Sequence, residues 1–144
     1  PGAFAGDEWT ALLESAGFAG PFRPDTLPAP VLVHEPCTGR FGARGPSAAL
    51  RLLRAAGVDA RPFEGAACCG GAAPFLIDAP DLSRDLGAAA RAAVAASGAR
   101  TLVTSDPGCL LQFSAAGGAE GSAAPVVLHL ATALLRLVEP AAPR

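Results

Sequence analysis

Four cysteines are the residues of this chain best suited to chemistry. Cys37 stands alone, Cys68 and Cys69 are adjacent in "GAACCGGAAP" (65–74), and Cys109 follows an Asp-Pro-Gly sequence. Thiolates are soft ligands that suit zinc and iron-sulfur clusters, and grouped thiols in a reducing compartment favour a metal over disulfides. The four cysteines are therefore candidate ligands of a metal centre.

The cysteine doublet bears on the choice of metal. Structural zinc usually takes cysteines from pairs spaced two to four residues apart, and the chain contains no Cys-x-x-Cys pair. Adjacent cysteines have diverging side chains and make poor partners on one tetrahedral ion, whereas a cluster can take each sulfur on a different iron. The doublet favours an iron-sulfur cluster, with zinc as the alternative.

Two glycines, Gly70 and Gly71, directly follow the doublet. Glycine lets backbone N–H groups approach a sulfur atom without steric cost, and such donors offset the negative charge of thiolates and raise a cluster's reduction potential. We expect these two amides to be donors to the cofactor site, although a tight turn would also use them.

Other uses of the cysteines remain open. Free cysteines are often small buried apolar residues. The chain could be an interaction module that docks onto a redox subunit, with its cysteines around structural zinc or free of metal. Cys68 and Cys69 could instead form a vicinal redox pair that performs thiol-disulfide chemistry.

The surrounding pattern predicts strands alternating with helices. Strands are expected at 31–35, 58–64, 101–105 and 125–130, and helices at 46–57, 80–98, 108–116 and 130–140. Such alternation indicates a single α/β domain with a short, mostly parallel four-stranded sheet flanked by helices. Each cysteine follows a strand, so all four should converge at the carboxyl edge of the sheet, where open α/β folds bind ligands.

Some finer features are also predicted. Pro62 suggests that the second strand is at an edge or ends early. Asp81 should cap the helix at 80–98, whose buried stripe should contain Leu82, Leu86, Ala89, Ala90, Ala93 and Val94. Residues 1–30 are expected to form a short helix (7–17) and a proline-rich linker, and residues 31–144 the cysteine-rich domain.

Composition excludes several classes of function. The chain has 144 residues, 17% of them charged, and a net charge of -2, which gives no basic surface for nucleic acid. No apolar run is long enough to span a membrane and no signal peptide is evident, so we expect a cytoplasmic protein, with peripheral membrane association left open. The sequence contains no phosphate-binding loop, nucleophile elbow or dinucleotide fingerprint.

Several polar residues near the cysteines are candidates for additional ligands. His34 and His129 lie at strand ends, where a polar residue with a hydrogen-bond partner is more common than a ligand. A carboxylate is a hard ligand for an iron-sulfur cluster, so a turn-forming role is favoured for Asp106. Arg40 and Arg44 could meet an anionic partner, but solvated loop arginines are commoner.

Three motifs together resemble a known family. "HEPC" (34–37), "CCGG" (68–71) and "DPGCLLQF" (106–113) are similar to the cysteine-rich CCG domain found in heterodisulfide reductase, in the glycolate oxidase iron-sulfur subunit and in lactate-utilisation proteins. The resemblance covers roughly residues 31–138. It implies that Cys37, Cys68, Cys69 and Cys109 are the metal ligands.

The chain departs from the family pattern at one position. The family ends in Cys-x-x-Cys, and Asp106 stands where the first of these cysteines would be. The resemblance therefore implies a four-thiolate [4Fe-4S] centre of the glycolate and lactate branch. It also implies a C-terminal CCG domain that transfers electrons without being a complete enzyme, with a flavoprotein dehydrogenase subunit and other iron-sulfur subunits or domains as partners.

Overall fold

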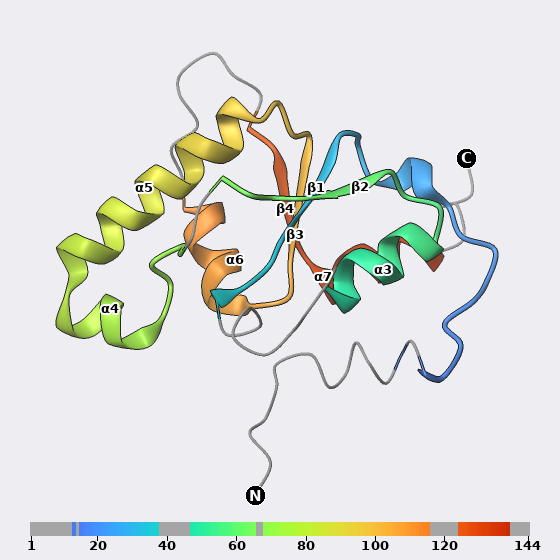
Figure 1. Ribbon diagram of the computed structural model, residues 1–144, viewed down its shortest axis with the longest axis horizontal. Helices are drawn as coiled ribbons and strands as arrows, with labels where there is room; N and C mark the ends of the chain where they lie inside the picture. Colours follow the sequence, from blue (N-terminus) through green and yellow to red (C-terminus); the bar gives the residue numbers. More distant parts are fainter. Residues whose placement is uncertain (1–12, 14, 38–46, 66–67, 116–123, 139–144) are drawn as a thin grey trace, which may run out of the picture.

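A four-stranded parallel sheet lies at the centre of the fold (Figure 1). The computed structural model describes residues 13, 15–37, 47–65, 68–115 and 124–138. The strands are β1 (Val31–His34), β2 (Ala60–Pro62), β3 (Thr101–Thr104) and β4 (Val126–His129), in the order β2-β1-β3-β4. Every neighbouring pair is parallel. The predicted α/β class and the four parallel strands are confirmed.

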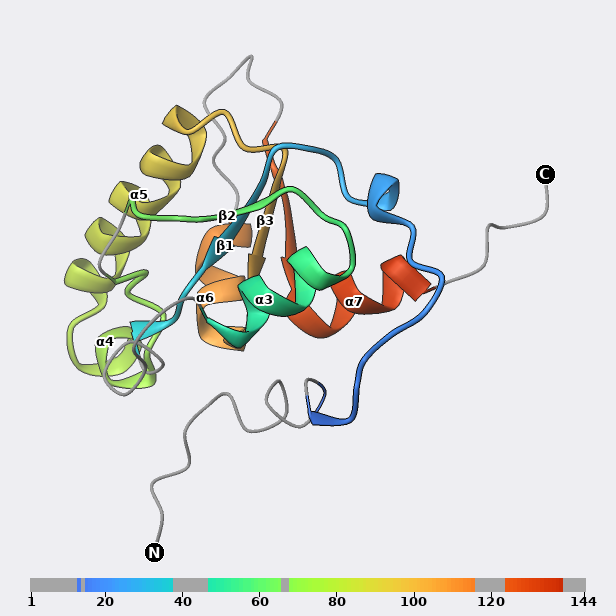
Figure 2. The ribbon, with the colours of Figure 1, turned by 45° about the vertical axis from the view of Figure 1, so that its right-hand side comes forward.

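Helices cover both faces of this sheet (Figures 1 and 2). Side chains alternate along each strand, so Val33 and Val103 enter one apolar cluster and Leu102 the other. The first cluster is formed with α3 (Ala48–Ala55) and α7 (Leu130–Val138), and the second with α5 (Pro80–Ala96) and α6 (Pro107–Ser114). Cys69 and Cys109 belong to the second cluster.

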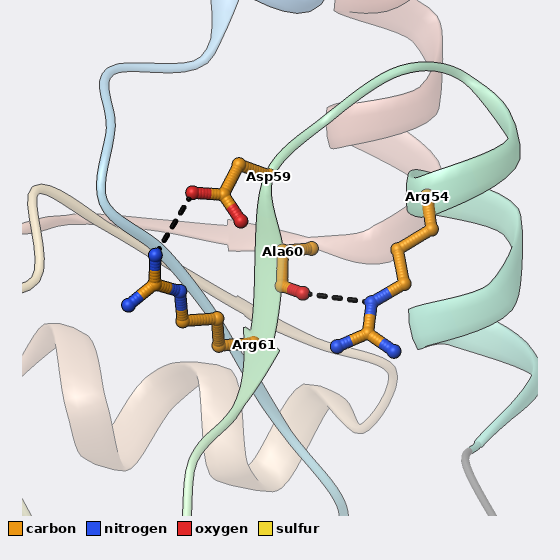
Figure 3. Close-up of polar contacts among 4 residues, drawn as sticks. All are labelled: Arg54, Asp59, Ala60 and Arg61. Atoms are coloured by element: carbon orange, nitrogen blue, oxygen red, sulfur yellow. Dashed lines mark hydrogen bonds and ion pairs between the residues drawn. The ribbon is translucent and has the colours of Figure 1, made fainter.

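Strand β2 is an edge strand, as Pro62 predicted. Figure 3 shows the polar contacts of Ala60 and its two neighbours in the chain. The Ala60 carbonyl accepts a hydrogen bond from Arg54 Nε of α3 at 2.9 Å. Beside it, Arg61 and Asp59 form an exposed ion pair at 3.1 Å. The Arg54 side chain thus satisfies a carbonyl that could otherwise accept a hydrogen bond from another strand, and charged side chains lie on both sides of that carbonyl. Both features protect the edge from pairing with another chain.

The buried face of helix α5 was predicted correctly only in part. Ala90 and Val94 are buried as predicted and Ala93 packs against the core, whereas Leu82 and Ala89 are exposed. The cap position is Ala79, whose side chain makes no capping bond, so the prediction that Asp81 is the cap is wrong; Asp81 pairs instead with Arg84. The buried side of the helix contains Ser83, Gly87, Ala90 and Val94, whereas Leu82 is 47% exposed. Small residues face inward in the first half of α5 because α6 approaches closely there, as the Gln112 contacts described below show.

Two short elements were not predicted. Helix α4 (Ala73–Asp78) begins directly after the cysteine doublet and its glycines, and a 3-10 turn covers Pro24–Thr26. Leu27 is buried in the core and Phe22 packs against it, so the end of the proline-rich segment rests on the domain. The helix predicted at 7–17 lies mostly outside the described residues.

Candidate functional site

Cys69 and Cys109 form a buried thiol pair. Their sulfur atoms lie 2.7 Å apart, and the two residues are only 3% and 4% exposed. Cys69 comes from the loop between β2 and α4, whereas Cys109 lies in the first turn of α6, 40 positions further along the chain. The fold therefore brings together two of the four predicted ligands.

The position of Cys109 is fixed by local chain chemistry. Asp106 caps α6, and its Oδ1 accepts a hydrogen bond from the Cys109 N–H at 2.8 Å. Pro107 follows at the start of the helix, where a missing N–H costs nothing. Asp106 thus has the local structural role that the sequence favoured over ligation.

The doublet loop places backbone donors on its own sulfurs. Gly70 N–H donates to Cys68 Sγ and Gly71 N–H donates to Cys69 Sγ, each at 3.3 Å. Gly70 has a φ of +74°, and a Cβ there would lie 2.7 Å from the Ser83 carbonyl oxygen. Glycine is therefore needed at position 70 both for its backbone conformation and for the space.

Two glycine backbones touch beside the thiol pair. A Cβ on Gly71 would overlap the carbonyl oxygen of Gly108, and a Cβ on Gly108 would lie 2.6 Å from the carbonyl oxygen of Gly71. Gly71 is two residues after Cys69, and Gly108 directly precedes Cys109. The absence of side chains at these two positions lets the loop and α6 approach closely enough for the sulfurs to meet.

Side chains of α5 and α6 hold the loop in place. Ser83 Oγ donates to the Gly70 carbonyl at 2.9 Å. Gln112 Nε2 donates to the Ser83 carbonyl at 3.1 Å and to Ser83 Oγ at 3.0 Å. Sequence reasoning missed Ser83, Gly108 and Gln112, because their roles depend on contacts between separate segments; the "PG" before Cys109 was the one local signal.

The other two cysteines are less enclosed. Cys37 and Cys68 are partly buried, and Cys37 lies three residues beyond β1. Within the described part of the chain, which contains all four cysteines, no three His, Cys, Asp or Glu residues are grouped closely enough to hold a metal ion. Ligation by Cys37, Cys68, Cys69 and Cys109 together stays a prediction.

Both histidines make ordinary polar contacts at strand ends. His34 is 2% exposed, with Nδ1 3.2 Å from Thr104 Oγ1 and its ring edge-on to Phe113. His129 Nδ1 accepts from the Ala131 N–H, so Nε2 carries the proton that is donated to the Ser105 carbonyl at 3.0 Å. These contacts agree with the structural role favoured for both residues. Arg40 and Arg44 lie outside the described residues.

The contact between the sulfurs shifts the pKa values of the two thiols in opposite directions. The hydrogen bond with Cys109 lowers the pKa of Cys69 from 9.0 to about 7; the Gly71 N–H also lowers it, while burial and the Asp106 charge oppose. The pKa of Cys109 is raised, first by its bond to Cys69 and then by burial. When Cys69 is ionised, the Cys109 thiol is the donor to it, so the pair shares one proton near neutral pH.

The shared proton predicts how the stability of the reduced, metal-free protein depends on pH. From about pH 7 to 9.0 the unfolded chain keeps the proton that folded Cys69 has lost, so the free energy of unfolding should rise by about 1 kcal/mol per pH unit. Above 9 the unfolded chain also ionises Cys109, whose folded pKa is raised, and stability should fall again. Urea unfolding from pH 6 to 10 with reductant and chelator measures this curve.

The chain contains no lysine or tyrosine, so neither residue type contributes to the pH dependence of stability in this range. Cys109→Ala removes the side-chain donor to Cys69 and should flatten the rise between pH 7 and 9. A wild-type curve as flat as that of the variant would contradict the assignment.

Comparison with known proteins agrees with the cysteine pattern. A family model of the CCG cysteine-rich domain matches residues 31–114, more than half of the chain. No curated protein and no solved structure matched the chain. The matched range contains the single cysteine, the doublet, the buried thiol pair and the glycines that bring the pair together. On this match, the chain belongs to the CCG family of cysteine-rich domains.

Proposed function

We propose that this domain binds an iron-sulfur cluster of the [4Fe-4S] type and carries electrons in a complex that oxidises a 2-hydroxy acid such as glycolate or lactate. The observation that carries the proposal is the buried Cys69–Cys109 pair with a backbone amide directed at the sulfur of Cys69. Membership of the cysteine-rich family is consistent with metal or cluster binding.

The residues present fit a sulfur-ligated metal centre in their chemistry. Two thiols from separate segments already meet, and N–H donors are directed at both sulfurs of the doublet. Buried thiolates with amide donors are the usual environment of iron-sulfur ligands. Cys69 and Cys109 would supply the buried ligands, and Cys37 and Cys68 the more accessible ones. Zinc is the alternative metal for the same sulfurs.

A bound cluster would supply one-electron transfer. The chain's own contribution is to set the polarity around the ligands. Gly70 and Gly71 donate N–H groups to the sulfurs and stabilise negative charge on them. Phe113, in the same apolar cluster as Cys69 and Cys109, shields that side of the pair from water. Alcohol oxidation requires a flavin partner, so the domain would serve as one electron-carrying part of a larger enzyme.

An exposed apolar surface next to the doublet supports a protein partner. Helix α4 follows the doublet loop directly, and its Ile77 is 77% exposed and Leu76 51%, while Leu82 at the start of α5 is 47% exposed. Exposed apolar side chains grouped in this way are typical of interaction sites. We propose that the flavoprotein dehydrogenase subunit or an iron-sulfur subunit docks on this surface, close to Cys68.

The proposed setting is the cytoplasm, where thiols stay reduced and available for ligation. Among the helices of the described residues, none is long and apolar enough to cross a bilayer.

Metal analysis of the full chain tests the proposed cofactor. The protein is purified without oxygen and assayed for iron, acid-labile sulfide and zinc, together with its absorption spectrum. Iron and sulfide in equal amounts with a broad visible band support the proposal. Zinc alone would replace it with a structural metal site, and reduced thiols that take up neither metal under reconstitution conditions would overturn metal binding altogether.

A further inference from the structure

The contact between Cys69 Sγ and Cys109 Sγ has a chemical use that does not require a metal. We propose that these two cysteines form a reversible intramolecular disulfide when a small peroxide oxidises the protein. The sulfur atoms lie 2.7 Å apart, and an S–S bond of about 2.0 Å needs only a small further approach. The structure thus assigns a dithiol site to a pair different from the adjacent doublet.

Backbone contacts keep the two sulfurs in reach of each other. The touching backbones of Gly71 and Gly108 join the two segments next to the cysteines. The Asp106 cap fixes the Cys109 backbone, and Ser83 Oγ fixes the loop through the Gly70 carbonyl. Because folding has already closed the 40-residue separation between the cysteines, oxidation does not have to bring the sulfurs together.

The partner of Cys69 in this reaction is Cys109, not its neighbour in sequence. Cys69 Sγ contacts Cys109 Sγ, whereas Cys68 Sγ accepts the N–H of Gly70. A disulfide between adjacent cysteines also closes a small ring whose geometry departs from the relaxed form. The observed contact therefore favours the long-range pair.

The oxidation balances with hydrogen peroxide as the oxidant. The sulfur of Cys69 attacks one peroxide oxygen, the O–O bond breaks, and a sulfenic acid and one water form. The sulfur of Cys109 then attacks the sulfenic sulfur, the S–O bond breaks, the S–S bond forms, and the second water leaves with the Cys109 proton. The two thiols together lose two electrons and two protons, and the peroxide becomes two waters.

Burial of the two thiols limits which oxidants can reach them. The two residues are 3% and 4% exposed, so a small peroxide can reach the pair more readily than a protein disulfide can. Return to the dithiol takes two electrons from a dithiol reductant. One consequence rests on the proposed function. The disulfide removes two of the four candidate ligands, so the oxidised domain would not load a cluster until it is reduced.

Peptide mapping tests the pairing in the full chain. The protein is stripped of metal with a chelator, reduced, treated with hydrogen peroxide, blocked with N-ethylmaleimide and cleaved by trypsin without reductant. Cleavage after Arg54, Arg84, Arg100 and Arg136 places Cys68 and Cys69 on peptide 55–84 and Cys109 on peptide 101–136. The expected product is these two peptides joined by a bond that dithiothreitol breaks.

Serine variants show which cysteines form the disulfide. The joined product should persist in Cys68→Ser and Cys37→Ser and disappear in Cys69→Ser and Cys109→Ser. Loss of the product in Cys68→Ser, a bond within peptide 55–84, or sulfinic acid without a disulfide would each overturn the proposal.

A second readout separates this proposal from the proposed function. Iron uptake is compared between reduced and peroxide-treated protein after the peroxide is removed and before any reductant is added. We expect uptake in the reduced protein and at least a tenfold loss in the oxidised one. A mapped disulfide in a protein that takes up no iron when reduced would overturn the cluster alone, and equal uptake by the reduced and the disulfide form would overturn the switch.

Discussion

Replacing Gly71 by alanine is expected to lower the free energy of unfolding by about 1–3 kcal/mol and to move Cys69 away from Cys109. The new Cβ would overlap the backbone carbonyl of Gly108, which cannot rotate aside as a flexible side chain can. The loop and α6 must then separate. Urea unfolding measures the stability, and the yield of the Cys69–Cys109 disulfide after peroxide treatment measures the sulfur separation.

The contact is reciprocal, which provides an internal check. Gly108→Ala places a Cβ 2.6 Å from the carbonyl oxygen of Gly71 and should produce the same two effects. Gly20→Ala is the matched control, because its Cβ would meet only Phe22 at an ordinary 3.9 Å. If Gly71→Ala and Gly20→Ala have equal stability and disulfide yield, the glycine contact does not position the thiols.

Replacing Cys109 by serine should lower the bound iron by more than about tenfold in protein reconstituted with iron and sulfide. Serine keeps the size and the Asp106 cap on its N–H, but its hydroxyl is a poor ligand for a cluster. Cys69→Ser should behave in the same way, since the two sulfurs share the site. Iron and sulfide assays with the visible spectrum measure the loss.

A substitution elsewhere on α6 controls for the general effect of a new serine. Leu111 lies on the same helix but is 70% exposed, so Leu111→Ser should leave iron binding unchanged. Circular dichroism confirms that each variant is folded. Wild-type iron content in folded Cys109→Ser would remove this residue from the ligand set.

The sequence carried most of the information about the sheet. Short apolar runs such as "VLVH" and "TLVT" alternate their side chains between two faces, and both faces are covered by helices. Glycine at position 57 takes a φ of +82° just after α3, as a helix end requires. These signals were readable because each one acts within a few residues of chain.

The cysteine doublet and its glycines were also visible in the sequence, including the expectation that amides of Gly70 and Gly71 lie near sulfur. Which thiols meet was not visible. Sequence adjacency drew attention to Cys68 with Cys69, while the structure pairs Cys69 with Cys109. The pairing depends on the fit of two glycine backbones from separate segments, and no local pattern specifies that fit.

The buried face of α5 was likewise only partly predictable from the sequence. Alanine and leucine spacing predicted a stripe through Leu82 and Leu86, but the helix presents Ser83 and Gly87 to the interior. Hydrophobic periodicity reports how much apolar area a face can bury, whereas close helix packing selects small side chains and hydrogen bonds such as Gln112 to Ser83. The sequence by itself determined the elements and their order, because these follow from local preferences and periodicity. Only the tertiary structure decided the thiol pair and the side chains that the first half of α5 buries, because these follow from contacts between residues far apart in the chain.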